Sequence, residues 1–135
     1  MPPTSILLVE DNQLVRNVVR DILESEGWRV ETYEDGVTAL EKIQSNEYYD
    51  VILTDNDLPG LSGVDIIRHA RTLAHRRHTP IIMLSAVPQE ATASRAGADA
   101  FLQKPEDICK IVETIKQHLK PQSYAILVVE DEEEN

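Results

Sequence analysis

Short apolar runs alternate with helical patterns along almost the whole chain, and this alternation constrains the fold more than any other feature. Runs typical of buried strands occupy residues 6–9, 51–54 and 81–84, while a more alternating run occupies 29–33 and a mixed run 98–103. Parallel strands are joined by long crossover connections, which are right-handed and usually helical. The alternation therefore predicts a doubly wound α/β fold, with helices on both faces of a five-stranded parallel sheet.

Four segments place apolar residues three and four positions apart, which is the spacing of a helix that packs one face against a core. The residues of these four apolar stripes are Leu14, Val15, Val18, Val19, Ile22 and Leu23; Val37, Leu40 and Ile43; Ile66, Ile67, Ala70, Leu73 and Ala74; and Ile108, Ile111, Val112, Ile115 and Leu119. The last helix is predicted to end before Pro121. Residues 86–97, after the fourth strand run, have almost no apolar stripe, and we expect this segment to be mobile or irregular.

The length of 135 residues, with 41% of them hydrophobic, suits one compact domain and is too short for two. No apolar run approaches the roughly 18 residues that cross a membrane, and the first residues lack the pattern of a secretion signal. We therefore expect a cytoplasmic protein that makes no membrane contact through this segment. The single cysteine, Cys109, excludes an internal disulfide, and the four scattered histidines argue against a zinc site.

The formal net charge of −11 argues against direct binding to nucleic acid, because the phosphate backbone attracts basic residues and repels acidic surfaces. Part of this charge is an acidic run at residues 130–134, which is most simply a solvated tail. One basic patch interrupts the acidic background, and it consists of His75, Arg76, Arg77 and His78. We interpret this patch as a solvated loop rather than a recognition site.

Polar residues stand where four of the predicted strands end. Glu10 and Asp11 follow the first strand, Asp55 ends the third, Ser85 ends the fourth and Lys104 ends the fifth. Ligands of an open parallel sheet bind outside the carboxyl ends of its strands. Any one of these residues alone would be an ordinary helix cap or turn residue. Because four strands deliver them to one edge, we interpret them together as a candidate functional site.

Several sequence motifs occur in an order that matches the predicted strands. They are Leu-Leu-Val-Glu-Asp-Asn at 7–12, Asp-Gly at 35–36, Tyr-Asp-Val-Ile-Leu-Thr-Asp at 49–55, Leu58, Pro59 and Gly63, Pro-Ile-Ile-Met-Leu-Ser-Ala at 80–86, and Ala-Gly-Ala-Asp-Ala-Phe-Leu-Gln-Lys-Pro at 96–105. With these motifs the chain resembles, from about residue 6 to residue 119, the receiver domains of two-component response regulators, the CheY-like superfamily. The resemblance implies a flavodoxin-like three-layer sandwich with strand order 2-1-3-4-5.

The same resemblance implies a metal site around a phosphoacceptor. Asp55 matches the phosphoacceptor residue of the family, and Glu10 and Asp11 match the acidic pair that holds Mg²⁺ or Mn²⁺. Asp57 matches the residue whose backbone carbonyl joins the metal ligands. These four positions are therefore the expected metal site.

Further positions match the family's switch and its structural residues. Ser85 and Lys104 resemble the residues that contact the phosphoryl oxygens, and Phe101 resembles the aromatic residue that turns inward when the hydroxyl residue moves. We also expect a cis peptide bond before Pro105, and a structural role for Gly63. Without the resemblance, Lys104 would be an ordinary surface lysine and Phe101 a core aromatic residue. We expect Phe101 to be buried under both interpretations.

The charges of the candidate site argue for a divalent cation. Three carboxylates carry −3 and Lys104 returns +1, so the bare site is left near −2. Repulsion between two such carboxylates is about 4 kcal/mol at about 4 Å and an effective dielectric of about 20. Ligands that are all oxygen suit Mg²⁺ or Mn²⁺ rather than zinc. Phosphoryl transfer needs mainly positioning and charge stabilisation, which such a site supplies. The resemblance implies that the donor is a phosphohistidine on a histidine kinase or histidine phosphotransfer protein.

Two residues beside the site are candidates for modulating its chemistry. Asp57 stands two residues after Asp55, and Val87 stands two residues after Ser85. The Asp57 carboxylate at the mouth of the site would repel anionic donors or alter the access of the water that hydrolyses the phosphate. Residues 86–97 are also about one helical turn shorter than the family usually has, which weakens any inference of a receiver dimer.

We expect residues 1–120 to form the receiver domain and residues 121–135 to form a C-terminal extension. The sequence Ile-Leu-Val-Val-Glu-Asp at 126–131 nearly repeats Ile-Leu-Leu-Val-Glu-Asp at 6–11. The shift between the two is about the size of one such domain. One interpretation is the first strand of a second receiver, so that the chain is a fragment of a tandem-receiver or hybrid histidine kinase protein. The other is an acidic tail after a short apolar stretch.

Two other functions fit part of the sequence. Asp55, Asn56 and Asp57 after an apolar strand also resemble the nucleophile loop of haloacid-dehalogenase-type phosphatases, which likewise form an aspartyl phosphate. The acidic pair on an earlier strand and the proline at position 59 argue against this enzyme class. The second alternative is a pseudo-receiver, a binding module that kept the fold and lost phosphorylation. We expect a signalling domain that catalyses only its own phosphorylation and dephosphorylation, and in that sense not an enzyme.

Overall fold

The computed structural model describes residues 3–119, where strands and helices alternate as the sequence predicts. The strands are β1 (Ser5–Val9), β2 (Arg29–Tyr33), β3 (Val51–Asp55), β4 (Ile81–Ser85) and β5 (Ala100–Gln103). The helices are α1 (Gln13–Glu24), α2 (Gly36–Gln44), α3 (Gly63–Thr72), α4 (Glu90–Ala96) and α5 (Ile111–His118), with short 3-10 helices η1 (Ala74–Arg76) and η2 (Ile108–Lys110). Each strand begins and ends within two residues of its predicted limits.

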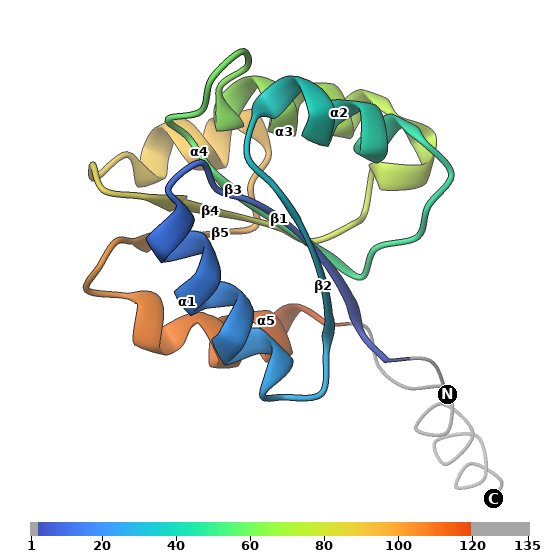
Figure 1. Cartoon of the computed structure of the whole chain (residues 1–135). Helices are drawn as coiled ribbons and strands as arrows, with labels where there is room; N and C mark the ends of the chain where they lie inside the picture. The colour runs from blue at the N-terminus through green and yellow to red at the C-terminus, as the bar shows by residue number, and fades with distance from the viewer. Residues whose placement is uncertain (1–2, 120–135) are drawn as a thin grey trace, which may run out of the picture.

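The five strands form one sheet in the order β2-β1-β3-β4-β5, and every neighbouring pair is parallel. Helices α1 and α5 cover one face of the sheet, and α2, α3 and α4 cover the other (Figure 1). The described part of the chain therefore has three layers. The predicted doubly wound α/β sandwich and its strand order are confirmed.

Successive residues of the central strands fill two separate hydrophobic cores, because side chains of a strand alternate between its two faces. On β1, Leu7 and Val9 belong to the core under α2, α3 and α4, whereas Ile6 and Leu8 belong to the core under α1 and α5. All four side chains are fully buried. A strand that is covered on both faces needs an apolar residue at nearly every position. This requirement explains the continuous apolar runs in the sequence.

Three apolar residues predicted to lie on packed helix faces are instead exposed. Leu14 is 73% exposed, Val18 45% and Val37 49%. On α1 the packed row contains Val19 and Leu23, which are fully buried. Leu14 and Val18 each stand one position before a residue of the packed row. One position along a helix is a rotation of about 100°, so these two side chains leave the packed face. The apolar stripe of α1 is thus wider than the surface that it buries.

Residues 86–97 contain a regular helix, so the expectation of an irregular segment is wrong for most of its length. Helix α4 runs from Glu90 to Ala96 and ends at Gly97, which adopts φ = 116°. Its small side chains are its packing face, since Ala93 is fully buried and Ala96 nearly so. Within 86–97, only residues 86–89 and Gly97 lie outside this helix. Alanines pack close to the sheet without forming an apolar stripe of large residues.

The basic patch at residues 75–78 is not uniformly a solvated loop. Three of its four residues are exposed, but Arg76 is only 2% exposed. The Arg76 guanidinium donates hydrogen bonds to the backbone carbonyls of Ile43, Ser45 and Glu47. It also lies over the ring of Tyr49, 5.1 Å from the centroid. Arg76 is therefore a structural residue at the carboxyl end of α2, and the prediction for it was wrong.

The repeat at residues 126–131 lies outside the described residues, so the domain boundary at residue 120 stays a prediction. Within residues 3–119, no helix has the length and apolar character needed to cross a membrane.

Candidate functional site

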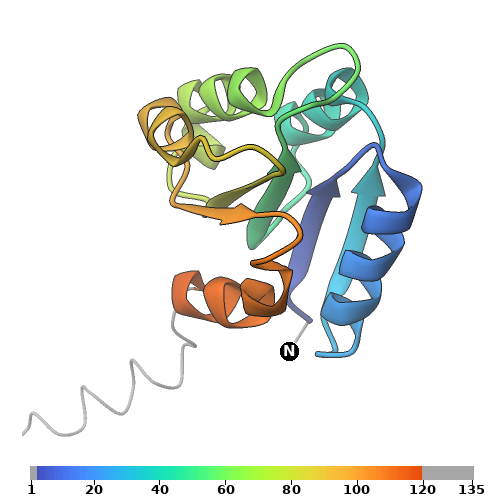
Figure 2. The same ribbon diagram turned by 90° about the vertical axis from the view of Figure 1, so that its left-hand side faces the viewer.

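The carboxyl ends of the parallel strands meet at one edge of the sheet and deliver the predicted residues there. Figure 2 shows β1 and β2 running in the same direction toward this edge. Glu10 comes directly after β1, Asp55 is the last residue of β3 and Ser85 is the last residue of β4. Lys104 follows β5, and its backbone N–H donates a hydrogen bond of 2.8 Å to the carbonyl of Ser85. The strand ends thus join residues that are far apart in the sequence.

Three carboxylates lie together at this edge. Glu10, Asp11 and Asp55 each offer an oxygen within 4.8 Å of the other two. Glu10 and Asp55 are buried, at 0% and 4% exposure, whereas Asp11 is exposed to solvent. The cluster therefore has two shielded carboxylates and one that opens to water.

Lys104 is the cation that contacts both buried carboxylates. Its Nζ lies 2.8 Å from Glu10 Oε1 and 3.2 Å from Asp55 Oδ2. Burial opposes the charge of the ammonium group, but the hydrogen bond to Glu10 and the charge of Asp55 outweigh it and raise the pKa of Lys104. Lys104 is therefore positively charged at neutral pH, and it is not an ordinary surface lysine.

Burial also shifts the pKa of Glu10, and it raises the pKa of this carboxyl whereas it opposes the charge of Lys104. Removal from water and the nearby charge of Asp55 raise the pKa of Glu10, although the hydrogen bonds from Lys104 and from the backbone N–H of Asn12 partly offset this.

Arg16 adds a second positive group, since its Nη1 donates to the carbonyls of Glu10 at 2.8 Å and Asp11 at 3.4 Å. The loop after β1 is thus held by a residue one turn into α1.

These residues fit a divalent cation. The three carboxylates and Lys104 sum to −2, which one divalent ion neutralises. Every side-chain ligand is an oxygen, which is the ligand type of Mg²⁺ and Mn²⁺. The exposed carboxylate of Asp11 would give such an ion an approach from solvent.

The backbone around Asp55 holds its carboxylate in place. Asp55 Oδ1 accepts hydrogen bonds from the N–H groups of Asn56 at 2.7 Å and Asp57 at 3.4 Å. Gly63 lies so close that a Cβ atom there would meet the Asp55 carbonyl oxygen at 2.2 Å. Only glycine fits at this position, which gives a physical reason for the structural role expected of Gly63. The Asp57 side chain is exposed at the mouth of the site, and the position of its carbonyl as a metal ligand stays a prediction.

The Ser85 hydroxyl makes its hydrogen bonds to residues outside the acidic cluster. Its Oγ accepts hydrogen bonds from the backbone N–H of Val87 at 3.1 Å and from Nε2 of Gln89 at 2.7 Å. Within residues 3–119 it makes no hydrogen bond to Asp55. Val87 itself is 52% exposed at the rim of the site.

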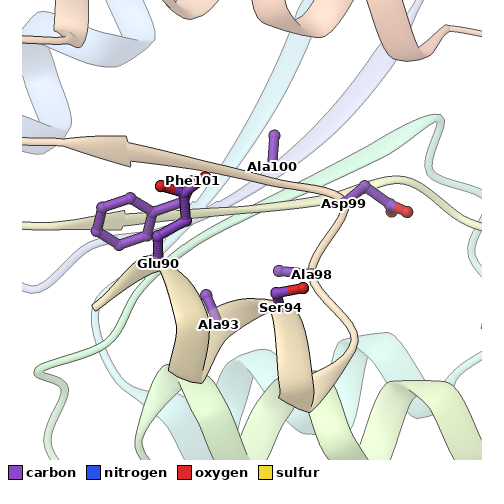
Figure 3. A pocket seen from close by; sticks show the side chains of 7 residues that line it. All are labelled: Glu90, Ala93, Ser94, Ala98, Asp99, Ala100 and Phe101. Carbon is purple, nitrogen blue, oxygen red and sulfur yellow. The ribbon is translucent and has the colours of Figure 1, made fainter. Parts of the chain in front are cut away.

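Phe101 lies away from the acidic cluster, on β5, and its expected burial is wrong. It is half-buried and lines a pocket of about 90 Å³ between α4 and β5, together with Glu90 and Ala93 (Figure 3). Two of the α4 residues that line the pocket, Ala93 and Ser94, have small side chains. The peptide bond between Lys104 and Pro105 is cis.

Three residues that contact the site were not predicted from the sequence. Arg16 holds the carbonyls after β1, Gln89 contacts Ser85, and Asn56 contacts Gln89. Arg16 lies in the first turn of α1, five residues after Asp11, and this nearness to the acidic pair was a usable signal. Asn56 and Gln89 lie on loops, where side-chain hydrogen bonds depend on conformations that periodicity does not reveal.

Comparison with known proteins agrees with this geometry. The family model described as the response regulator receiver domain matches residues 6–116 of the chain. Among curated proteins, the polar-differentiation response regulator DivK of Brucella anthropi is 31% identical over 120 residues, which cover 87% of this chain and 97% of DivK.

Solved structures give the same result. The chemotaxis protein CheY4 of Vibrio cholerae superposes with a TM-score of 0.79 at 29% identity, covering 87% of this chain and 99% of CheY4. The receiver domain of the sensor histidine kinase PA1611 from Pseudomonas aeruginosa superposes with a TM-score of 0.78 at 32% identity, covering 86% of this chain and 97% of that domain. That structure has a magnesium ion coordinated in its active site cleft.

Receiver domains are signalling modules of two-component systems and not enzymes in the usual sense. The family match spans most of the chain, and the strand order and the acidic cluster at the carboxyl edge of the sheet agree with it. The chain belongs to the response regulator receiver domain family.

Proposed function

We propose that this chain is the phosphoacceptor of a two-component phosphorelay, and that Asp55 accepts the phosphoryl group. The donor is a phosphohistidine on a histidine kinase or a histidine phosphotransfer protein. One observation carries the proposal: the buried Asp55 carboxylate lies within 4.8 Å of the carboxylates of Glu10 and Asp11 and 3.2 Å from the Lys104 ammonium. This arrangement combines a nucleophile, metal ligands and a fixed positive charge in one place.

The proposed transfer uses Asp55 as the nucleophile. An Asp55 carboxylate oxygen forms a bond to phosphorus while the bond between phosphorus and the histidine nitrogen breaks, and the imidazole leaves with its electron pair. Glu10, Asp11 and Asp55 would hold Mg²⁺, which would supply further charge neutralisation at the phosphoryl oxygens. Lys104 already lies beside Asp55 Oδ2, so its charge requires little rearrangement when the oxygens arrive.

The phosphorylated state differs from the free state in the contacts that it offers. An aspartyl phosphate carries about −2 in place of −1 and presents new acceptor oxygens. Ser85 then has a partner at Asp55 that it lacks in the free protein, where its hydroxyl is engaged by Val87 and Gln89. The pocket beside Phe101 gives this ring room to change position. A contact that only one state offers shifts the balance between the two states.

A surface on α1 suits the docking of the donor protein. Leu14 and Val18 are one helical turn apart, are 73% and 45% exposed, and follow shortly after the acidic pair. Residues four positions apart lie on the same face of a helix, and contiguous exposed apolar surface is where protein partners bind. A helix of the donor that packs on Leu14 and Val18 would have its histidine within reach of Asp55.

Phosphorylation by a small donor tests the proposal directly. The chain is incubated with phosphoramidate and Mg²⁺, and intact-mass measurement followed by peptide mapping locates the modification. We expect one phosphoryl group on Asp55, and its loss in Asp55→Asn. Asp21→Asn, which alters an exposed carboxylate of α1, is the matched control and is expected to be modified like the wild type.

Two outcomes would contradict the proposal and identify the alternatives. Sustained release of phosphate from p-nitrophenyl phosphate, abolished by Asp55→Asn, would indicate a phosphatase. Absence of any modification at Asp55 in folded protein with Mg²⁺ present would indicate a pseudo-receiver.

A further inference from the structure

We propose that Gln89 is a positioning residue that holds the Ser85 hydroxyl in its unphosphorylated place. This inference rests on the proposed function, because it concerns the movement of Ser85 toward a phosphoryl group on Asp55. We call the Gln89 side chain, with its contacts to Ser85 and Asn56, the amide latch. Its expected effect is to favour the free state over the phosphorylated state.

Both acceptor positions of the Ser85 hydroxyl are occupied. A hydroxyl oxygen has two lone pairs, and Ser85 Oγ accepts one hydrogen bond from the Val87 backbone at 3.1 Å and one from Gln89 Nε2 at 2.7 Å. Ser85 is fully buried, so water does not readily replace a lost partner. The contact to Gln89 is the shorter of the two, and it comes from a side chain that can move independently of the strand.

The other end of the Gln89 amide contacts the loop after Asp55. Gln89 Oε1 accepts a hydrogen bond from Asn56 Nδ2 at 3.4 Å. Asn56 is itself fixed, because its Oδ1 accepts the backbone N–H of Val64 at 3.0 Å in the first turn of α3. The amide latch thus links the loop after β3 to the loop after β4, on the two strands that supply the phosphoacceptor and the switch hydroxyl.

Movement of Ser85 toward Asp55 changes the hydrogen bond between Ser85 and Gln89. The Gln89 bond must break, or Gln89 must leave Asn56 and follow Ser85. Gln89 directly precedes α4, and its side chain makes no capping hydrogen bond to that helix. The next residue, Glu90, lines the pocket that contains Phe101 (Figure 3). The latch therefore connects the hydroxyl at the site to the start of the helix beside the aromatic ring.

Gln89→Leu removes both amide contacts at similar side-chain size and tests the latch. Beryllofluoride with Mg²⁺ is titrated into each variant, and binding is followed by the backbone amide NMR signals of Val87 and Lys104. Beryllofluoride mimics the phosphoryl group, so its affinity reports the cost of the switch. We expect Gln89→Leu to bind about threefold to tenfold more tightly than the wild type, the factor that one buried neutral hydrogen bond is worth. Gln117→Leu, on the exposed face of α5, is the matched control and is expected to leave the affinity unchanged.

A double-mutant cycle separates a latch from a general change in the loop. In a Ser85→Ala background there is no hydroxyl to hold, so we expect Gln89→Leu to leave beryllofluoride affinity unchanged. Gln89→Ala gives a second variant in which loss of the amide does not introduce a larger apolar group. Equal or weaker binding by both Gln89 variants, or the same tightening with and without Ser85, would overturn the latch. Wild-type protein that binds no beryllofluoride would instead refute the proposed function.

Discussion

At the scale of single residues, Glu10 is the most costly group of the site. It is a fully buried carboxylate beside the carboxylate of Asp55, and among residues 3–119 only Lys104 and the backbone N–H of Asn12 donate hydrogen bonds to it. A buried charge with incomplete compensation destabilises the folded state. The expected benefit of this arrangement is functional, because a divalent ion that binds there recovers the lost stability.

Glu10→Gln should therefore stabilise the metal-free protein. The amide keeps an acceptor for Lys104 and removes one negative charge, and we expect the free energy of unfolding to rise by about 1 kcal/mol, an ordinary size for one substitution. The pKa of Glu10 is raised in the folded state, so the folded protein binds more protons than the unfolded chain between that raised pKa and 4.5. Wild-type stability should thus increase as the pH falls through this window, and the difference from Glu10→Gln should shrink. Urea unfolding at several pH values with EDTA present measures both effects.

The same unfolding experiment with Mg²⁺ in place of EDTA tests whether Glu10 holds the ion. An ion that binds only the folded state stabilises it by about 2.7 kcal/mol at 100 times its dissociation constant. We expect Mg²⁺ to stabilise the wild type and to have a much smaller effect on Glu10→Gln. Equal stabilisation of both proteins would show that Glu10 does not hold the ion.

At the scale of elements, the carboxyl end of α2 depends on a residue from a different part of the chain. Arg76, in η1, donates to the carbonyls of Ile43, Ser45 and Glu47 at the end of α2, and the Ser45 carbonyl also contacts Nε2 of His75 at 2.8 Å. Its positive charge also suits the negative end of the helix dipole. This contact joins α2 to the segment between α3 and β4.

Arg76→Ala should destabilise the protein by about 3 kcal/mol, because the buried carbonyl of Ile43 loses its side-chain donor, two partly buried bonds are lost with it, and the guanidinium leaves the ring of Tyr49. The neighbouring Arg77 is exposed, and we expect Arg77→Ala to change stability by less than about 0.5 kcal/mol. Thermal or urea denaturation of the two variants measures the difference. Similar losses in both would mean that the net charge of the patch matters and the position of Arg76 does not.

The elements themselves were largely predictable from the sequence, and the exceptions have physical causes. The strands were predicted within two residues because burial on both faces requires continuous apolar runs. The regularity of helix α4 was not expected, because its packing face is built from Ala93 and Ala96 rather than from large apolar residues. The burial of Arg76 was not expected either, because its partners are backbone carbonyls more than 25 positions earlier in the chain.

At the scale of the whole molecule, the sheet topology explains why much of the candidate site was predictable. Parallel strands end at the same edge, so Glu10, Asp11, Asp55 and Lys104 had to lie near one another once the strand order was known. The contacts of Arg16 and Gln89 were not predictable in this way, because they depend on side-chain conformations in loops and at a helix surface. The topology thus determines which residues meet, and local packing determines their hydrogen bonds.

The two ends of the sheet should also differ in their interactions with a donor protein. Leu14 lies on α1, next to the edge that carries Asp55, whereas Tyr48 precedes β3 and therefore lies toward the opposite edge. Both side chains are exposed, Leu14 by 73% and Tyr48 by 61%. If α1 is the docking surface, loss of apolar area there should slow transfer from a protein without altering the chemistry at Asp55.

We therefore expect Leu14→Ser to reduce the rate of phosphotransfer from a histidine kinase by about tenfold, which corresponds to about 1.4 kcal/mol and is the size of loss expected when a buried side chain near the centre of an interface is truncated. The kinase is one that labels the wild type in a screen with radioactive ATP, and labelling by phosphoramidate is measured in parallel. Tyr48→Ser, the matched control, should leave both rates unchanged. Slower labelling of Leu14→Ser by phosphoramidate as well would place the defect in the site itself, and equal slowing by both substitutions would place the donor elsewhere on the surface.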